Sequence, residues 1–308
     1  MRHRFLALLF LCAAAFAQNS GRTSNGELAL YAYRNAFPGK TGVVSFIEND
    51  WTITAGGETF FWAGGRILPQ AEKDKIDSYD PLPFWIYPEE LAPPEAYPPQ
   101  YIEILRDRGA GQARLERKDA HRAFQSILYG GFDRRGIEAL LVHVEFLGKK
   151  INVHRDITER LRRVDAEIRK WDGAKDFIAS LDSIGGYNWR EIAGTQRMSY
   201  HSWGLAVDIL PKRLAGKAIY WMWEQERNKD WMLVPLEKRW NPPAQVIAAF
   251  EKEGFIWGGK WPFYDNMHFE YRPELLEYRR LMTAHPDKNT AANGHRQDLH
   301  HVSPDLPR

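Results

Sequence analysis

The sequence predicts an α+β fold, in which a small, mostly antiparallel sheet is flanked by helices and preceded by an N-terminal extension that contains β-strands. Three patterns support this class. Apolar residues between Gly42 and Leu68 fall among glycine-pair turns, as in antiparallel hairpins. Three later segments carry apolar residues at helical spacing, and short apolar runs at 205–210 and 267–271 have the length of buried strands. The 308 residues are enough for one or two domains with a sizeable core.

The first seventeen residues are predicted to be a secretory signal peptide. Arg2 and Arg4 precede an apolar run over residues 5–16, and Ala15-Phe16-Ala17 is a small-x-small cleavage site. The apolar run is too short to cross a bilayer, so we expect no membrane span. The expected location of the protein is therefore periplasmic or secreted, after cleavage behind Ala17.

The only cysteine, Cys12, lies inside this signal peptide. It follows Leu11 rather than a small residue, so a lipoprotein is not expected. Without Cys12 the mature chain has neither disulfides nor thiolate metal ligands. Without Arg2 and Arg4, the 42 basic residues become 40, equal to the 40 acidic ones. This balance gives no reason to expect nucleic acid or an anionic membrane as partner.

The N-terminal extension is predicted to hold β-hairpins and a proline-rich linker. Residues 18–40 are polar and show no clear periodicity, whereas Gly42 to Leu68 reads as hairpins. Residues 81–99 hold seven of the eighteen prolines, which excludes a helix or a central strand there. The predicted divisions of the chain are a signal peptide at 1–17, the extension at 18–100, the main domain at 101–284 and a disordered tail at 285–308.

The main domain is predicted to mix strands and helices. Leu140 to Phe146 is a β-like apolar run. Asp156-Ile-Thr-Glu159 is a capping box for a helix whose inward face is Ile157, Leu161, Val164 and Ile168. A second helix is expected from Pro242-Pro243 to Gly254, with Val246, Ile247 and Phe250 inward, and a third from Pro273 to Leu281.

Two segments of the main domain carry residues suited to metal binding. The first is Ser199-Tyr-His201-Ser-Trp-Gly204-Leu-Ala206-Val-Asp208, and the second is Asp265-Asn-Met-His268-Phe-Glu270. His201, Asp208 and His268 form a three-ligand set, and a catalytic zinc keeps a fourth position open for water. Spacing alone is a weak signal, because a His and an Asp seven residues apart also fit a hydrogen-bonded His–Asp pair at a strand end. Without the flanking residues, that pair would be favoured.

The flanking residues distinguish these alternatives. The pattern SxHxxGxAxD followed by DxxH resembles the peptidoglycan zinc peptidases of the D-Ala-D-Ala carboxypeptidase and L-alanyl-D-glutamate peptidase type. These enzymes share their fold with the hedgehog signalling domain. Arg197 and the segment Trp257-Gly-Gly259-Lys-Trp261 also match what the family shows. The resemblance covers roughly residues 120–283 and is most specific at the two motifs.

The resemblance implies a role for each matching residue. The ligands of Zn²⁺ would be His201, Asp208 and His268. Asp265 would be the general base, with Glu270 as the alternative. Arg197 would bind a substrate carboxylate or the developing oxyanion, unless it is a surface ion-pair partner. Ser199 would help to hold the substrate or a ligand in place.

The implied function is a secreted zinc peptidase that hydrolyses peptide bonds in peptidoglycan stem peptides. A D,D-carboxypeptidase and an L-alanyl-D-glutamate endopeptidase both remain open, and we expect Trp189-Arg190 and the aromatic residues between 221 and 240 to decide between them. A non-catalytic binding module on the same fold and a dipeptidase for free D-amino-acid dipeptides are the alternatives. Trp203, Trp257 and Trp261 either line a cleft or pack in the core, and core packing is expected for at least two of them. The sequence does not indicate which oligomeric state the protein adopts.

Overall fold

A computed structural model describes residues 26–81, 84–91, 93–109, 118–119, 122–192 and 198–285. The predicted signal peptide, Arg197 and the predicted tail beyond residue 285 lie outside this part of the chain. Within the described part, no helix combines the length and the apolar character that a membrane crossing requires.

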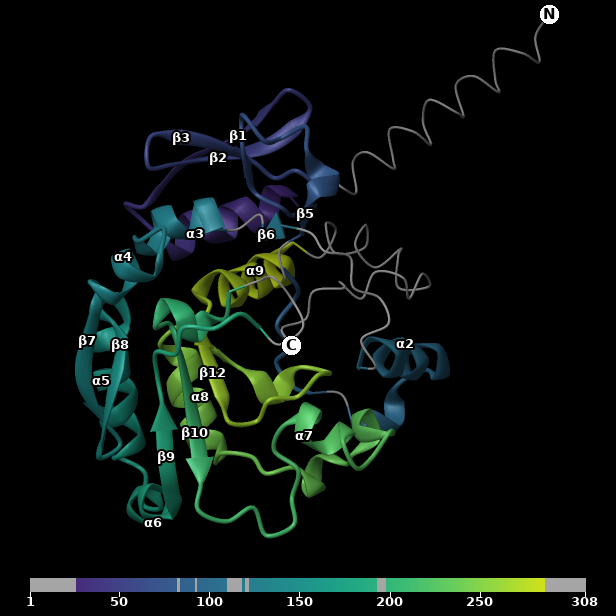
Figure 1. Ribbon diagram of the computed structural model, residues 1–308, viewed down its shortest axis with the longest axis vertical. Coiled ribbons are helices and arrows are strands. Elements are labelled where there is room, and N and C mark those ends of the chain that lie inside the picture. Colours follow the sequence, from purple (N-terminus) through teal and green to yellow (C-terminus); the bar gives the residue numbers. More distant parts are fainter. Residues whose placement is uncertain are drawn as a thin grey trace, which may run out of the picture.

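The structure is a mixed α+β fold with antiparallel sheets, which confirms the predicted fold class (Figure 1). The strands are β1 (Thr41–Ile47), β2 (Asp50–Ala55), β3 (Glu58–Phe61), β4 (Leu68–Pro69), β5 (Tyr79–Asp80), β6 (Lys118–Asp119), β7 (Leu141–Phe146), β8 (Lys149–His154), β9 (Leu181–Gly185), β10 (Ala206–Pro211), β11 (Phe255–Trp257) and β12 (His268–Tyr271). The helices are an N-terminal helix at 26–36, α2 (Pro99–Gly109), α3 (Arg122–Tyr129), α4 (Arg134–Glu138), α5 (Thr158–Ile168), α6 (Ala174–Ser180), α7 (Trp221–Gln225), α8 (Ala244–Lys252) and α9 (Pro273–Ala284).

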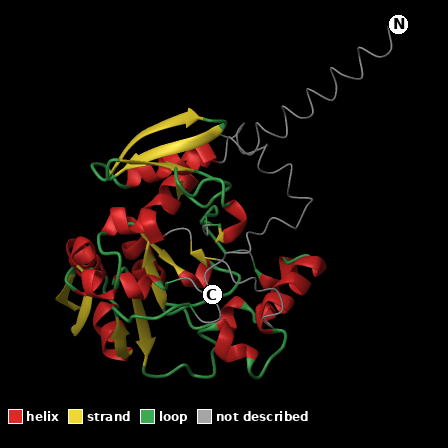
Figure 2. Ribbon diagram, turned by 45° about the horizontal axis from the view of Figure 1, so that its top comes forward, coloured by secondary structure: helices red, strands yellow, loops and turns green. Residues whose placement is uncertain are grey.

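The N-terminal region folds as a four-stranded antiparallel sheet in the order β1-β2-β3-β4, which confirms the predicted hairpins. Figure 2 shows this sheet at one end of the molecule, above helices. One of these is the helix at 26–36, where the sequence showed no clear periodicity. Its Tyr33 meets Phe124 of α3 edge to face, and Phe60 of β3 meets the same ring. The sheet and the two helices therefore share one aromatic core.

The second sheet has the antiparallel order β11-β12-β10-β9 and carries both predicted motifs. The predicted strands at 205–210 and 267–271 are β10 and β12, and they are direct neighbours. In their register Asp208 lies opposite His268, and on the other side of β10 Asp208 lies opposite Gly185. The central position of β10 thus places Asp208 in the middle of the sheet.

The predicted helices of the main domain are confirmed in position. The inward residues predicted for α5 are buried, and α8 begins directly after Pro243 and ends before Gly254. Phe250 of α8 stacks on Phe269 of β12 at a centroid distance of 3.9 Å. This contact fixes α8 against the sheet beside the second motif.

The predicted capping box of α5 is wrong. The helix begins at Thr158 after a single 3-10 turn, and its N-cap residue Ile157 supplies no side-chain cap. The carboxylate of Asp156 instead pairs with Lys40 from the N-terminal region, and Glu159 pairs with Arg162 within the helix. The long-range ion pair with Lys40 therefore engages the side chain of Asp156, which the local sequence had predicted as the helix cap.

One hydrophobic cluster joins the N-terminal region to the main domain. It includes Phe37 and Ile53 from the first and Phe250 and Phe269 from the second. In the proline-rich segment, residues 84–91 form neither helix nor strand, and their Tyr87 is fully buried. The Tyr87 hydroxyl donates to Glu251 of α8 and accepts the backbone N–H of Trp257 (3.0 Å). The predicted extension therefore shares its core with the residues that follow; its exact boundaries stay a prediction.

Candidate functional site

The structure brings together the three predicted metal ligands. His201 lies on a 3-10 turn (Tyr200–Trp203), Asp208 on β10 and His268 on β12. His201 Nε2 lies 3.2 Å from His268 Nδ1 and 3.1 Å from Asp208 Oδ2, and His268 Nδ1 lies 2.9 Å from Asp208 Oδ1. One atom from each residue lies within 4.8 Å of the other two, so a single ion could contact all three.

The spacing of the first motif has a local explanation in this structure. Ser199 begins the 3-10 turn, and its hydroxyl accepts a hydrogen bond from His201 N (3.3 Å). Gly204 ends the turn with φ +67°, in the left-handed region that favours glycine. The chain then enters β10 directly, so that His201 and Asp208 reach the same point from a turn and a strand.

The remaining ring nitrogens of both histidines are engaged. His201 Nδ1 lies 2.6 Å from the carbonyl oxygen of Gly186, which can only accept, so this nitrogen carries the proton. His268 Nε2 lies 3.2 Å from Glu270 Oε2 and donates to that carboxylate. The nitrogens that face the shared centre, His201 Nε2 and His268 Nδ1, are therefore the ones that would give up a proton to bind a metal ion, which is the arrangement that metal-binding histidines require.

The electrostatics of the three residues suit a cation. Burial opposes ionisation of Asp208, but the neighbouring His201 and hydrogen bonds from both histidines hold the pKa of its carboxyl well below the usual range. Burial also opposes a charge on His268, yet Asp208 and Glu270 raise its pKa to about 10. The buried carboxylate of Asp208 favours a positive charge at the shared centre. Two imidazole nitrogens and a carboxylate oxygen are suitable ligands for Zn²⁺, and ligand type alone also suits other divalent metals.

Asp265 stands beside this centre with an unpaired oxygen. Its backbone N–H bonds to Gly258 O (3.1 Å), and its Oδ1 is buried without a hydrogen-bond partner among the described residues. Burial raises the pKa of Asp265 to about 7. A Cβ at Gly258 would lie 2.5 Å from the Asp265 carbonyl oxygen, which explains why the preceding segment needs glycine there.

Glu270, the alternative base, lies on the same face of β12 as His268, as predicted. Both of its oxygens are already engaged: Oε2 with His268 and Oε1 with Nη1 of Arg272 (3.3 Å). Of the two carboxylates, Asp265 is the one whose Oδ1 has no partner in the described part of the chain. The geometry therefore favours Asp265 as the proton acceptor.

A small cavity of about 40 Å³ lies against Asp265 and His268. Its other lining residues include Arg190, Ser199 and Trp261. Such a volume holds water but no substrate side chain, so a substrate would lie at its mouth. The exposed Arg190 is the described arginine on this lining, and its charge opposes the rise in the pKa of Asp265. The predicted Arg197 lies outside the described residues. Arg190, which the sequence analysis named only for the choice of bond, is therefore the described candidate for binding a substrate carboxylate.

The three tryptophans near the motifs are buried. Trp203 and Trp257 belong to the hydrophobic core, as predicted for two of the three. Trp261 is also buried, but its ring lies 5.4 Å from the His268 ring and lines the cavity. It therefore packs in the core and shields the site from one side.

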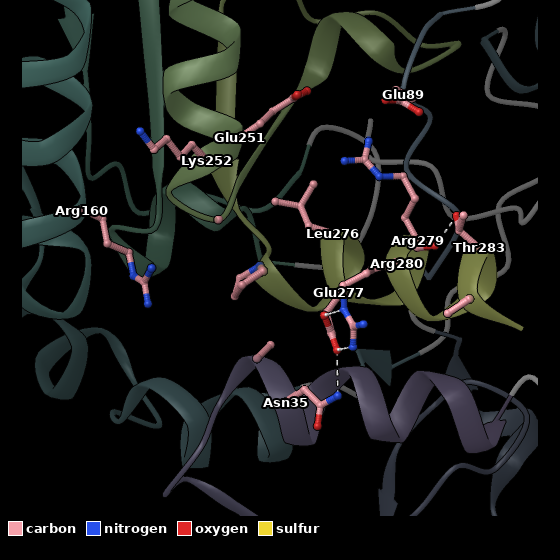
Figure 3. Close-up of a pocket in the computed structure, with 14 residues that line it drawn as sticks. Asn35, Glu89, Arg160, Glu251, Lys252, Leu276, Glu277, Arg279, Arg280 and Thr283 are labelled. Carbon is pink, nitrogen blue, oxygen red and sulfur yellow. Dashed lines mark hydrogen bonds and ion pairs between the residues drawn. The ribbon is translucent and has the colours of Figure 1, made fainter.

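A larger hollow of about 730 Å³ lies elsewhere, between the helix at 26–36, α8 and α9 (Figure 3). Its charged residues mostly satisfy one another. Glu277 accepts from Arg280 and Asn35, and Glu251 pairs with Lys260. None of the residues of the two motifs lines it, so the candidate site is the small cavity at the metal ligands.

Comparison with known proteins supports this assignment. Residues 193–271 match the family model described as D-alanyl-D-alanine carboxypeptidase. The match covers 79 of the 308 residues and confirms the predicted family resemblance over this stretch. Residues 29–84 match a domain of unknown function, DUF8518. No solved structure matches the chain.

Proposed function

We propose that the protein is a zinc-dependent peptidase that hydrolyses peptide bonds in peptidoglycan stem peptides. The observation that carries the proposal is the convergence of His201, Asp208 and His268 beside the unpaired oxygen of Asp265. This convergence lies within the stretch that matches the carboxypeptidase family, so the D-Ala-D-Ala bond is the first candidate for cleavage. The L-alanyl-D-glutamate bond is the second.

In this proposal His201 Nε2, His268 Nδ1 and the Asp208 carboxylate hold Zn²⁺. The ion would supply a Lewis acid that lowers the pKa of water to roughly 7 and polarises the scissile carbonyl. Asp265 Oδ1 accepts the proton of the attacking water and then passes it to the departing amine. This oxygen is available for both steps, because it is buried beside the proposed ligands and has no hydrogen-bond partner in the described part of the chain.

The remaining roles concern substrate binding. Arg190 at the mouth of the cavity binds the terminal carboxylate of the peptide or the developing negative oxygen, through its planar set of donors. Arg197 is the second candidate for this role. Ser199 lines the cavity and holds the turn that carries His201, so it contributes to ligand placement. The predicted signal peptide would deliver the enzyme to the periplasm or the exterior, where its substrate is found.

The test uses the purified protein with a synthetic stem pentapeptide that ends in D-Ala-D-Ala. Products are identified by mass spectrometry after incubation with zinc, with a chelator, and with zinc restored. Loss of one D-Ala indicates the carboxypeptidase, and a cut after L-Ala indicates the endopeptidase. Free D-Ala-D-Ala as a parallel substrate tests for a dipeptidase. An intact pentapeptide in the presence of zinc-loaded protein would contradict the proposal and favour a non-catalytic binding module.

A further inference from the structure

A row of charged side chains begins at the proposed metal ligand His268 and leads away from the cavity. His268, Glu270 and Arg272 alternate along one face of β12 and its end, and Glu274 follows in the first turn of α9. Glu270, Arg272 and Glu274 expose 3%, 1% and 1% of their surface. Glu270 still lines the cavity, whereas Arg272 and Glu274 are buried behind it and do not line it.

Hydrogen bonds connect this row without interruption. His268 Nε2 donates to Glu270 Oε2, Arg272 Nη1 donates to Glu270 Oε1, and Arg272 Nε donates to Glu274 Oε1. Glu270 therefore has one oxygen for the histidine and one for the arginine. Because Arg272 is held from both sides, the position of the Glu270 carboxylate is fixed.

Residues of the N-terminal region enclose Arg272. Its guanidinium carbon lies 5.6 Å from the ring centre of Trp85, in the proline-rich segment, and 5.0 Å from that of Tyr200, next to His201. Tyr33, from the helix at 26–36, interacts through its phenol with the charge of Arg272. Both N-terminal segments therefore contribute to the surroundings of a residue two steps from the metal ligand.

Stability alone does not account for this arrangement. Burying three charges costs several kcal/mol of desolvation per ion, and well-packed apolar residues of similar volume often stabilise a fold at least as well. A buried carboxylate that orients a metal-binding histidine has a different benefit. It fixes the tautomer and ring orientation and raises the basicity of the ligand nitrogen.

We propose that Glu270 and Arg272 are positioning residues for the metal site, and that Tyr33 and Trp85 extend this support into the N-terminal region. Glu270 holds the His268 ring with Nδ1 directed at the shared centre, and Arg272 holds Glu270. The stretch that matches the domain of unknown function then contributes Tyr33 to the support of the metal site. The inference rests on the proposed metal site, but it does not depend on which bond is cut.

The main test measures zinc affinity by competition with a chromophoric chelator, using the full chain. Glu270→Gln keeps an oxygen that can accept from His268 but removes the charge and the acceptor pair for Arg272. We expect zinc affinity to fall about 10- to 100-fold. Glu251→Gln is the matched control, because Glu251 also accepts from two donors, Tyr87 and Lys260, without contacting His268. Its zinc affinity should equal that of the parent.

A second variant covers the case in which Glu270→Gln does not fold. Tyr33→Phe removes a single hydroxyl from the N-terminal helix, far from the metal ligands in sequence. We expect it to fold and to lose several-fold in zinc affinity, whereas a merely structural role would lower only the unfolding temperature of the metal-free protein. Zinc affinity equal to the parent in both folded variants would overturn the inference.

The same measurements separate this inference from the proposed function. A parent that binds zinc but leaves stem peptides intact contradicts the function, while a weakened Glu270→Gln variant still supports the positioning role. A parent that cleaves peptides, together with a Glu270→Gln variant that binds zinc equally tightly, supports the function and contradicts the positioning role. A parent without zinc affinity overturns both.

Discussion

The carbonyl oxygen of Gly204 accepts a hydrogen bond from the backbone nitrogen of His154 at 2.8 Å. This bond joins the end of β8 to the turn that carries His201. A Cβ on Gly204 would lie 2.7 Å from the same nitrogen and 2.7 Å from Leu141 Cδ2. Two strands of a separate hairpin thus abut the turn at the one position where a side chain is absent.

Gly204→Ala should therefore destabilise the protein through both backbone strain and overlap. The left-handed conformation costs an alanine about 1–2 kcal/mol, and overpacking costs about 1–3 kcal/mol more. Gly216→Ala is the matched control, because Gly216 has φ +78° but nothing within 4 Å of its added Cβ. Denaturant unfolding should show the larger loss for Gly204→Ala, accompanied by weaker zinc binding. Equal losses in the two variants would mean that the contact with β8 is unimportant.

The buried His154 should make the free energy of unfolding depend on pH. Its ring is buried, Nδ1 accepts from Asp156 N (3.1 Å) and Nε2 lies 2.9 Å from Tyr129 O. Burial lowers the pKa of His154 below that of the unfolded chain. The usual pKa of histidine is about 6.5. Below this pH the unfolded state binds a proton at His154 and the folded state does not, so stability falls as the pH falls.

The slope of this loss should be at most about 1.4 kcal/mol per pH unit. His154→Gln can still donate to Tyr129 O but does not titrate, so its free energy of unfolding should change less between pH 7 and pH 5. Chemical unfolding of parent and variant at these two pH values measures the difference. The comparison between the two cancels the other titrating groups, and parallel curves would contradict the assignment.

Asp265→Asn should remove hydrolysis and keep the metal. Loss of a general base lowers the rate by about a hundred- to ten-thousand-fold, whereas the three proposed ligands are untouched. The measurements are the hydrolysis rate on the stem pentapeptide and zinc affinity by chelator competition. Asp182→Asn, at an exposed position on β9, is the control and should retain the rate. A variant at position 265 with full activity would return the role to Glu270.

Arg190→Ala should weaken recognition of the substrate carboxylate. A charge-assisted hydrogen bond contributes about 1.5–3 kcal/mol, which corresponds to roughly 10- to 100-fold in kcat/KM. The parent should prefer a peptide with a free terminal carboxylate over its amide, and the variant should lose that preference. Arg213→Ala, on the exposed loop after β10, should leave it unchanged. A preference that survives in Arg190→Ala would assign the role to Arg197.

The three candidate metal ligands could be predicted because the residues that flank them in the two motifs resemble a known family. His201 and Asp208 are joined by a turn and a strand whose small residues are visible in the sequence. The pairing of Asp208 with His268 depends on strand register across sixty residues, which no local pattern encodes. The proposed positioning role of Arg272 could not be predicted either, because it also depends on contacts between residues distant in sequence.

The missed helix at 26–36 has a different physical reason. Leu28, Ala29 and Ala32 face one hydrophobic cluster, while Leu30 and Tyr33 face another. A helix buried on two sides lacks the single apolar stripe by which an amphipathic helix is found. The cap predicted at Asp156 is wrong for another reason. The local sequence favours a cap there, but the Asp156 carboxylate pairs with Lys40, which is distant in sequence.

The contact between the N-terminal helix and α9 has a consequence for biosynthesis. Leu28, Ala29 and Ala32 pack with Tyr278, Leu281 and Met282, so the two ends of the described chain meet in one cluster. Contacts of such long sequence separation form late, since the whole intervening loop must close first. On the ribosome this cluster cannot form until Met282 has emerged. The N-terminal helix therefore lacks its α9 packing partner until α9 has been synthesised.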